Sequence, residues 1–368
     1  MNRTINVGIV GCGNISDRYF DGLKQFEILR IVSCADVDSA RAQAKADQYQ
    51  LRAAGSVDEL LHDPAVDIVV NLTIPKAHAA VNTAALRAGK HVYCEKPFAL
   101  NSSDGAAVLA LAREKNLLVG SAPDTFLGSG IQTARKAIDD GLIGRPFGAM
   151  AFMLCHGHES WHPNPQFYYE QGGGPMFDMG PYYLTALVSL LGPATRVSGS
   201  TSCALTERIV TSEPLRGSRI KVQTPTHLTG TVDFASHATA TLVMSFDVWS
   251  VSIRPLMIFG TEGNLEVPDP NNFSGAVKLC RAGSDDYEEL PLVEGHGRGR
   301  GTGVADMAYS LLRRNRPHRA NGEMANHVVE IMESFEKSSL TSRHLILASS
   351  CAKPAALPGN LGATELDA

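Results

Sequence analysis

The sequence lacks the features that mark several large classes of protein. Its 368 residues contain no apolar run long enough to span a bilayer and no apolar segment of the signal-peptide kind. Acidic and basic residues are interspersed and the net charge is −5, which leaves no basic face for nucleic acid or for an anionic membrane surface. We therefore expect a cytoplasmic protein whose partner is a small molecule.

Paired cysteines are also missing. The cysteines are odd in number, scattered, and contain no CxxC pair. This excludes the common disulfide frameworks, zinc fingers and redox motifs, and it favours reduced thiols. The seven cysteines are Cys12, Cys34, Cys94, Cys155, Cys203, Cys280 and Cys351.

Two patterns of secondary structure follow one another along the chain. From Ile5 onward, short β-branched runs alternate with amphipathic helical segments, as in a parallel sheet built from βαβ units. After Thr125, strand-like runs of alternating apolar and polar residues dominate, which indicates a mostly antiparallel sheet with one covered face. We predict an α/β protein with a Rossmann domain over residues 1–124, a second α/β domain over 125–345, and a loose tail over 346–368.

A dinucleotide-binding motif follows the first predicted strand. The run VGIVGCGNIS places Gly11, Gly13 and Ser16 at GxGxxG spacing, at the start of a predicted helix. The first glycine permits a tight turn, the second lets the backbone approach a pyrophosphate, and the small third residue permits close packing. We expect Gly11, Gly13, Asn14 and Ile15 to contact the dinucleotide.

The second predicted strand leads into Asp36, which bears on the choice of cofactor. A carboxylate at this position can accept hydrogen bonds from the ribose hydroxyls of NAD and repels the additional phosphate of NADP. The sequence therefore predicts NAD in preference to NADP.

Two further segments follow strands of the same predicted sheet. The run NLTIPKAH carries Thr73, Pro75 and His78, and the run EKP carries Glu95 and Lys96. Ligands of open α/β sheets bind outside the carboxyl ends of the strands. We therefore expect these five residues to line the cofactor site.

The order of these motifs resembles that of a known family. The GxGxxG-like fold and the EKP run precede a glycine-rich segment, GGGPMFDMGPYYLTAL, which carries Asp178. With the runs IDDGLIGRPFG and IFGTEGNLEV and the segment GVADMAYSLLRRNRPHRANGEMANHVVEIMES, this combination resembles the glucose-fructose oxidoreductase and inositol dehydrogenase family (Gfo/Idh/MocA) from about Thr4 to Ser339. The resemblance implies a Rossmann domain followed by an α/β domain whose open sheet often forms subunit contacts, and hence a homodimer or homotetramer.

The resemblance also implies hydride transfer between nicotinamide and a carbohydrate carbon. Lys96 matches the family's EKP lysine, which binds the substrate hydroxyl and the nicotinamide ribose, and Asp178 matches its substrate-binding aspartate. The three glycines ahead of Asp178 are expected to form a flexible entry with room for the nicotinamide.

The chain departs from the family at Tyr182, where members commonly carry the histidine that moves the hydroxyl proton. A phenol, with a pKa of about 10, is a poor base at neutral pH. An ammonium group nearby lowers that pKa, so we hypothesise that Lys96 and Tyr182 form a proton-transfer pair. The alternative is that Tyr182 only fills space on a buried helix face.

Histidine and aromatic residues are dense just upstream, in MLCHGHESWHPNPQFYYEQGGG. We expect a sugar pocket in which Trp161 stacks on a sugar ring while His158 and His162 bond its hydroxyls, with His162 as the second candidate for the proton relay. A metal site of His156, His158 and His162 is the alternative. It is disfavoured because the spacing matches no common site and prolines follow the last histidine, so we expect no metal.

Three other places carry candidate residues. Asp124 is either a substrate contact or an ordinary turn-capping aspartate. The glycine-rich run GHGRGRGTGVAD indicates a flexible loop over the site, with Arg298, Arg300 and Asp306 as candidate contacts. His327 is expected to be a packing histidine.

Together these features predict an NAD-dependent oxidoreductase acting on a hydroxyl-bearing carbon of a sugar, glycoside or cyclic polyol. The candidate catalytic residues are Lys96, Asp178, Tyr182 and His162. A redox-neutral glycosidase that retains its reduced cofactor and a non-catalytic dinucleotide-binding regulator remain as alternatives.

Overall fold

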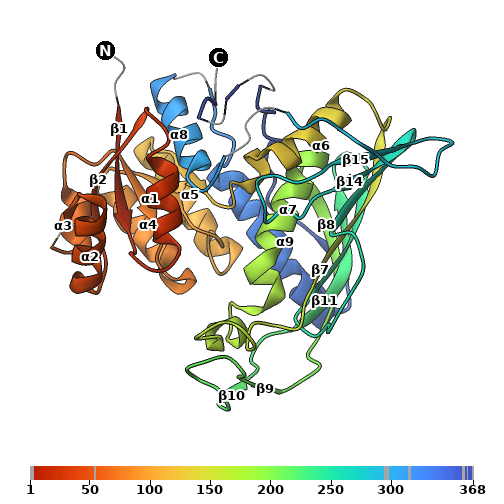
Figure 1. Cartoon of the computed structure of the whole chain (residues 1–368), viewed down its shortest axis with the longest axis horizontal. Helices are drawn as coiled ribbons and strands as arrows, with labels where there is room; N and C mark the ends of the chain where they lie inside the picture. The colour runs from red at the N-terminus through yellow and green to blue at the C-terminus, as the bar shows by residue number, and fades with distance from the viewer. Residues whose placement is uncertain are drawn as a thin grey trace. The chain divides into compact units, whose positions relative to one another are not determined.

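The computed structural model describes residues 4–53, 55–293, 298–313, 316–358, 361–362 and 364–366. The chain folds as two compact units (Figure 1). The first comprises Met1–Gln132, Val293–Asn326 and Pro354–Ala368, and the second comprises Thr133–Leu292 and His327–Lys353. Two segments late in the chain thus return to the first unit. The domain ranges expected from the sequence are contiguous and do not include this return.

The first unit is built on a six-stranded parallel sheet of order β3-β2-β1-β4-β5-β6. The strand order reverses between β1 and β4, which is the switch point at which α/β sheets bind ligands. The predicted Rossmann fold is confirmed. Its strands are β1 (Ile5–Val10), β2 (Leu29–Ala35), β3 (Arg52–Ala53), β4 (Ile68–Asn71), β5 (His91–Cys94) and β6 (Val119–Ser121). Its helices include α1 (Ser16–Leu23), α2 (Ser39–Tyr49), α3 (Val57–His62), α4 (His78–Arg87), α5 (Ser102–Lys115) and α8 (Thr302–Leu312).

Local capping explains where several of these helices begin. The side chain of Asp38 accepts a hydrogen bond from the Arg41 amide at the start of α2, and that of Asn101 accepts one from the Asp104 amide at the start of α5. Each cap satisfies an amide that has no partner within its helix.

The second unit contains a nine-stranded sheet of order β16-β15-β14-β13-β7-β12-β11-β8-β17. Within this sheet, β7 and β12 form the only parallel pair among the described strands, so the predicted mostly antiparallel sheet is confirmed. Its strands are β7 (Pro146–Leu154), β8 (Ala194–Ser202), β11 (His227–Phe234), β12 (Thr239–Ser245), β13 (Leu256–Gly260), β14 (Gly263–Val267), β15 (Lys278–Arg281), β16 (Glu288–Glu289) and β17 (Leu345–Ile346). A separate hairpin, β9 (Glu207–Ile209) with β10 (Arg219–Lys221), was not expected from the sequence.

Helices cover one face of this sheet (Figure 1). Helix α7 (Gly174–Leu191) packs against β7, β11 and β12. The part of α9 (Gly322–Thr341) that belongs to this unit packs on β8, where Ser338 Oγ accepts a hydrogen bond from the Gly199 amide. Helix α6 (Ser129–Asp139) joins α7 through Arg135, whose Nη1 donates to the Ser189 carbonyl.

The other face of the sheet is partly apolar. Strand β7 buries Ala151 and Met153 against the helices and exposes Met150 to 41% on the opposite face. This alternation follows from the period of two along a strand. Among the described residues, no helix is long and apolar enough to cross a membrane.

Candidate active site

The glycine-rich turn between β1 and α1 has the geometry that a dinucleotide site needs. Gly11 has φ +99°, and a Cβ there would lie 2.7 Å from the backbone of Leu72, so this position requires glycine. A Cβ at Gly13, in contrast, would meet nothing within 4 Å. Gly13 therefore leaves open space above the turn, at the start of α1, where a pyrophosphate can approach the backbone.

Asp36 lies beside this turn, at the end of β2. Its Oδ2 accepts a hydrogen bond from the Cys12 amide at 2.7 Å, and its Oδ1 accepts one from the Asp38 amide at 2.9 Å. A carboxylate oxygen has two lone pairs, so each oxygen can accept a further bond from a ribose hydroxyl. The guanidinium of Arg41 lies 3.7 Å from Asp36 and is half exposed.

The loop after β4 is fixed by His78 and Asn71. His78 is fully buried, with Nδ1 2.7 Å from the Pro97 carbonyl and Nε2 2.9 Å from the Thr73 carbonyl. Burial lowers the pKa of His78. Because both ring nitrogens face backbone carbonyls, we correct the expected cofactor contact: His78 joins the loop of Thr73 and Pro75 to the segment after β5.

Glu95 has a similar supporting role at the end of β5. Its Oε1 accepts a hydrogen bond from the phenol of Tyr19 at 2.8 Å, and its Oε2 accepts one from the Lys96 amide at 2.8 Å. Burial raises the pKa of Tyr19 far above its ordinary value. The buried carboxylate thus ties α1 to the backbone of Lys96, whose side chain is half-buried.

In the second unit, loops converge at one end of the nine-stranded sheet. Leu154 at the end of β7 pairs with Ser245 at the end of β12, and Leu256 at the start of β13 pairs with Val267 at the end of β14. Leu256 also pairs with Ala151 near the end of β7. The segments that leave these neighbouring strands, 155–165, 246–255 and 268–276, therefore begin at the same end of the sheet.

At this end the structure brings together three of the predicted substrate residues. His158 Nε2 lies 3.4 Å from Asp178 Oδ2, and both side chains are largely buried. The His158 ring stacks on Tyr168 with centroids 3.9 Å apart, and the Trp161 ring lies 5.2 Å away and is mostly exposed. A carboxylate, an imidazole and aromatic faces are the groups that bind sugar hydroxyls and sugar rings.

His162 lies next to this cluster. Its ring meets those of Trp161 and Tyr168 edge to face, and its Nδ1 accepts a hydrogen bond from the Asn164 amide at 3.0 Å. Burial lowers the pKa of His162, which favours the neutral imidazole that a proton acceptor requires. Within the described part of the chain, no group of three or more histidine, cysteine or acidic side chains is arranged to hold a metal ion.

Helix α7 carries Asp178 and Tyr182 one turn apart and continues through Pro181. Residues four apart lie on neighbouring turns of one helix face. The Tyr182 side chain is 6% exposed.

The glycines ahead of α7 are required by packing within this unit. Gly172 and Gly174 have φ values of +85° and +77°. A Cβ at Gly173 would lie 2.5 Å from the Phe167 carbonyl oxygen, and one at Gly174 would lie 2.7 Å from the Pro225 carbonyl oxygen. The expectation of a flexible entry is therefore wrong, because these glycines permit a close backbone approach.

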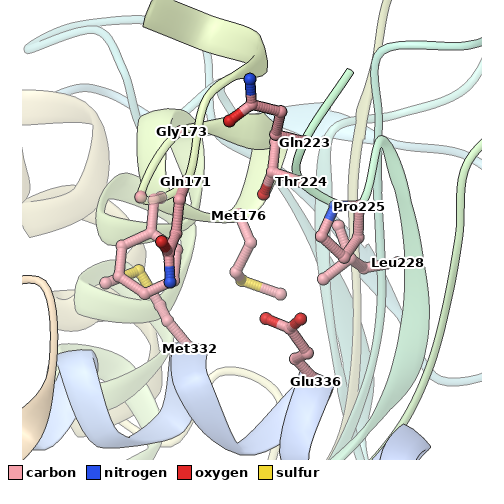
Figure 2. A pocket seen from close by; sticks show the side chains of 11 residues that line it. Gln171, Gly173, Met176, Gln223, Thr224, Pro225, Leu228, Met332 and Glu336 are labelled. Atoms are coloured by element: carbon pink, nitrogen blue, oxygen red, sulfur yellow. The ribbon is translucent and has the colours of Figure 1, made fainter. Parts of the chain in front are cut away.

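A small pocket of about 210 Å³ lies beside this turn (Figure 2). Met176 of α7, Glu336 and Met332 of α9, and Thr224 contribute side chains around it.

A larger cavity of about 410 Å³ adjoins the histidine cluster, because His158 and Trp161 are part of its lining. Tyr183 of α7 and Asp269 are both part of this lining, and burial raises the pKa of the Tyr183 phenol. Sequence reasoning missed Asp269 and the segment 246–255, since neither carries a recognisable motif and only strand pairing places them here. The lining residues are Phe152, Met153, Leu154, Cys155, Gly157, His158, Trp161, Met179, Tyr183, Val251, Ile253, Pro255 and Asp269.

A buried ionic cluster supports the segment that carries His158, and sequence reasoning missed it as well. Arg208 of β9 forms ion pairs with Glu159 and Asp247. The phenol of Tyr169 donates to the second oxygen of Glu159 and lies 3.4 Å from the His158 amide. An arginine in a short, polar hairpin gives no sequence signal that its side chain is buried.

Asp124 does not face a substrate. It is fully buried, and its Oδ2 accepts hydrogen bonds from the amides of Gly301 and Gly303, both at 3.0 Å. Arg300 Nη1 lies 3.5 Å from its Oδ1. Burial raises the pKa of Asp124. Asp124 therefore caps the N-terminus of α8 through a long-range contact, instead of the local turn cap that the sequence offered as its second role.

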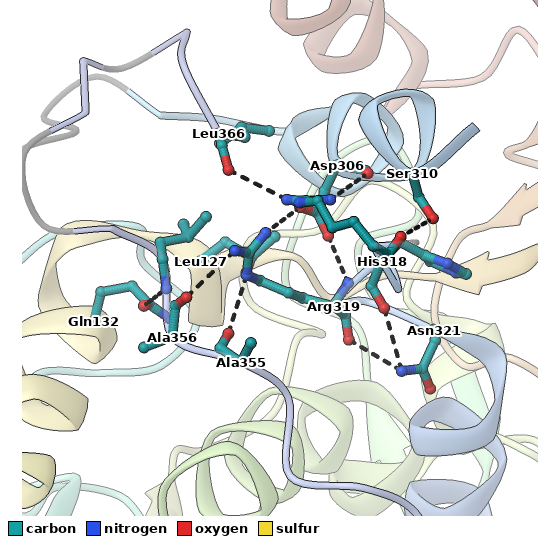
Figure 3. A network of polar contacts seen from close by, with 12 residues as sticks. Leu127, Gln132, Asp306, Ser310, His318, Arg319, Asn321, Ala355, Ala356 and Leu366 are labelled. Atoms are coloured by element: carbon teal, nitrogen blue, oxygen red, sulfur yellow. Dashed lines mark hydrogen bonds and ion pairs between the residues drawn. The ribbon is translucent and has the colours of Figure 1, made fainter. Parts of the chain in front are cut away.

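Asp306 and its arginines hold the C-terminal segment (Figure 3). The Asp306 carboxylate is fully buried and pairs with Arg316 and Arg319. Arg319 Nε donates to the Ala355 carbonyl at 3.0 Å, and Arg316 Nη2 donates to the Leu366 carbonyl at 3.2 Å.

Two expectations from the sequence are wrong in this part of the structure. In the part of the C-terminal segment that the structure describes, Leu357, Leu361 and Leu366 are buried, so this part is not loose. The predicted flexible loop is helix α8 from Thr302 onward, and the buried Arg298 donates to the carbonyl of Leu127. Residues 295–297 of that loop lie outside the described part of the chain.

A six-stranded Rossmann sheet, a glycine-rich turn and a helix-covered antiparallel sheet together define a two-part dinucleotide-binding protein. Residues 5–122 match the oxidoreductase family with an NAD-binding Rossmann fold, GFO_IDH_MocA, and residues 131–266 match the GFO/IDH/MocA C-terminal domain. The chain belongs to the Gfo/Idh/MocA oxidoreductase family.

Individual relatives agree with this assignment. The chain is 28% identical to 1,5-anhydro-D-fructose reductase of Ensifer adhaerens over 84% of its own length and 93% of that protein. It is 33% identical to inositol 2-dehydrogenase of Salmonella typhimurium, over 42% of this chain and 45% of that protein. An NAD binding oxidoreductase from Klebsiella pneumoniae has the same fold, with a TM-score of 0.82, 22% identity, and coverage of 94% of this chain and all of that one.

Proposed function

We propose that this protein is an NAD-dependent oxidoreductase acting on a hydroxyl-bearing carbon of a sugar, a glycoside or a cyclic polyol. The observation that carries the proposal is the His158–Asp178 pair, 3.4 Å apart, with Tyr168 and Trp161 beside it. Family membership and the names of the two curated relatives, which act on an anhydro sugar and on inositol, support it.

In the proposed mechanism, the glycine turn and Asp36 would hold NAD, which would supply the hydride acceptor for the hydroxyl-bearing carbon. Asp178 accepts a hydrogen bond from a substrate hydroxyl and is held in place by His158. Trp161 offers an exposed aromatic face to the sugar ring.

The hydroxyl proton needs an acceptor, and this chain has two candidates. We assign it to Tyr182, with the Lys96 ammonium stabilising the phenolate, and His162 is the second candidate. The preference for NAD over NADP is assigned to Asp36, beside the glycine turn.

The subunit arrangement is part of the proposal. Met150 exposes apolar surface on the face of the large sheet opposite the helices, and exposed apolar surface favours association. We propose a homodimer or homotetramer formed through this face. A Met150→Glu substitution should then lower the mass measured by analytical ultracentrifugation, and an unchanged mass would show that subunits meet elsewhere.

The test of the activity is NADH formation with a panel of sugars, glycosides and cyclic polyols, beside chromatography of released products. Net NADH supports the dehydrogenase. Released aglycone without net NADH supports the redox-neutral glycosidase, an alternative with which the cavity next to the histidine cluster is compatible. If NAD binds and neither NADH nor aglycone forms, the result supports the regulator.

The matched variants are Asp178→Asn, which should remove turnover, and Asp286→Asn, an exposed carboxylate of the same unit. Full turnover in Asp178→Asn would contradict the assignment of Asp178 to the substrate site.

A further inference from the structure

The cavity of about 410 Å³ beside the histidine cluster has a lining unlike that of the cluster itself. Most of its side chains are apolar, and they come from β7, α7 and the segment before β13. Leu154, Met179 and Pro255 are among them. Small-molecule pockets have volumes of about 300–1,000 Å³ and are mostly apolar with a few placed polar groups.

Part of this lining is left open to water. Val251 and Ile253 are each 47% exposed, and both face the cavity. When an apolar group covers exposed aliphatic side chains in a concave site, the free energy of the system falls, because apolar surface leaves water.

The charges of the lining narrow the choice of occupant. None of its residues is a lysine or an arginine, and its one carboxylate, that of Asp269, accepts a hydrogen bond from the Asn271 amide. Phosphate groups are bound by arginine, lysine or free backbone amides. A nucleotide or phosphate substituent therefore does not suit this cavity.

The cavity is continuous with the proposed substrate site. His158 lines it and at the same time lies 3.4 Å from Asp178, and the ring of Trp161 borders both. A substrate whose sugar ring lies at Asp178 can therefore extend a substituent along the Ile253 side.

We propose that the substrate is a glycoside with an uncharged apolar aglycone, which this cavity holds while the sugar ring lies at the His158–Asp178 pair. This inference rests on the proposed function and deepens it. A free sugar or a cyclic polyol fills only the polar part of such a site.

The experiment compares kcat/KM for methyl and phenyl glucosides of both anomers, with NADH formation and product chromatography as readouts. The phenyl glucoside should exceed the methyl glucoside of the same anomer by at least about tenfold, since even one methylene in an apolar pocket is worth about tenfold or more. Equal kcat/KM values for the phenyl and the methyl glucoside, in both anomeric series, would overturn the inference.

Two isoleucine variants test the place of binding. Ile253→Ser should remove most of the phenyl preference, measured as the ratio of kcat/KM for the phenyl and methyl glucosides, because it changes the apolar wall. Ile346→Ser, at an exposed isoleucine of β17 outside the cavity, should keep the preference. If Ile253→Ser changes the mass of the oligomer and not the preference, the cavity is a subunit contact and the inference is wrong.

A direct binding measurement separates this inference from the proposed function. If neither glucoside is oxidised or cleaved, the proposed function fails for these sugars. Calorimetry then decides the inference: phenyl glucoside binding that Ile253→Ser weakens supports the apolar site, and binding that is absent or equal for both glucosides overturns it.

Discussion

Arg208 Nη1 lies 2.9 Å from Glu159 Oε1, with the two side chains only 1% and 8% exposed. The pair joins the β9–β10 hairpin to the residue that follows His158. A buried ion pair of this kind adds little net stability compared with apolar residues, but removal of one partner leaves an uncompensated buried charge.

We therefore predict that Arg208→Met is strongly destabilising, by about 3–5 kcal/mol. Arg219, which lies on the adjacent strand and pairs with Glu207 at the surface, is the matched control. Arg219→Met should change the free energy of unfolding very little, because exposed ion pairs are screened by solvent. Urea denaturation of the two variants measures the difference, and equal stabilities would contradict the role of the buried cluster.

The two glycines of the β1–α1 turn should respond differently to alanine. Gly11→Ala places a Cβ 2.7 Å from the Leu72 backbone at a positive φ, so it should lower the melting temperature. Gly13→Ala meets no protein atom within 4 Å, so the fold should be kept while NAD affinity falls. Thermal denaturation and NADH fluorescence titration separate the two effects. Normal NAD affinity in Gly13→Ala would show that the pyrophosphate does not approach this position.

Cofactor preference should depend on Asp36. Asp36→Ser removes the negative charge beside the glycine turn and leaves the nearby Arg41 guanidinium for a phosphate. We expect the ratio of NADP to NAD affinity to rise by about tenfold or more, equivalent to about 1.4 kcal/mol. Asp38→Ser is the control, because serine keeps the N-cap of α2. An unchanged ratio in Asp36→Ser would place ribose recognition on another residue.

Some parts of the site can be predicted from the sequence alone. The glycine turn and Asp36 are local features, since each lies at a strand end and its chemistry needs only neighbours in the chain. Asp124 could not be assigned in the same way, because the amides that it binds, those of Gly301 and Gly303, lie about 180 residues later.

Tertiary packing explains the other wrong expectations. The glycine spacing before α8 suggests mobility, yet Asp124 fixes the start of that helix. The C-terminal segment lacks a periodic apolar face, yet arginine side chains bind its carbonyls and single leucines anchor it. Such irregular contacts leave no period in the sequence.

Tyr182 is the residue whose substitution tests the proton transfer. Tyr182→Phe keeps the ring that α7 buries and removes only the hydroxyl. If Tyr182 accepts the proton, kcat should fall by about 10²-fold to 10⁴-fold and the pH profile should change shape. Tyr287→Phe, in the loop before β16, is the control. Full turnover with an unshifted pH profile would make Tyr182 a binding or packing group and direct attention to His162.

Acid stability should depend on His327, which is fully buried and accepts a hydrogen bond from the Ala194 amide at Nε2. Its Nδ1 lies 2.8 Å from Ser349 Oγ. Burial lowers the pKa of His327, so the unfolded chain takes up this proton more readily than the folded one. The contribution of His327 is therefore present above about pH 6.5, the pKa of an unfolded histidine, and is lost as the pH falls below it.

The expected slope is up to about 1.4 kcal/mol of unfolding free energy for each pH unit below this value. The His327→Gln variant should be less stable at neutral pH and should lose part of the slope, while His344→Gln, at an exposed histidine of the same unit, should keep it. Urea denaturation between pH 7.5 and pH 5, a window of about one unit above and one and a half below the unfolded pKa, measures both. Parallel curves for the parent and His327→Gln would show that protonation of this imidazole does not oppose folding, in which case the hydrogen bond from the Ala194 amide breaks without cost.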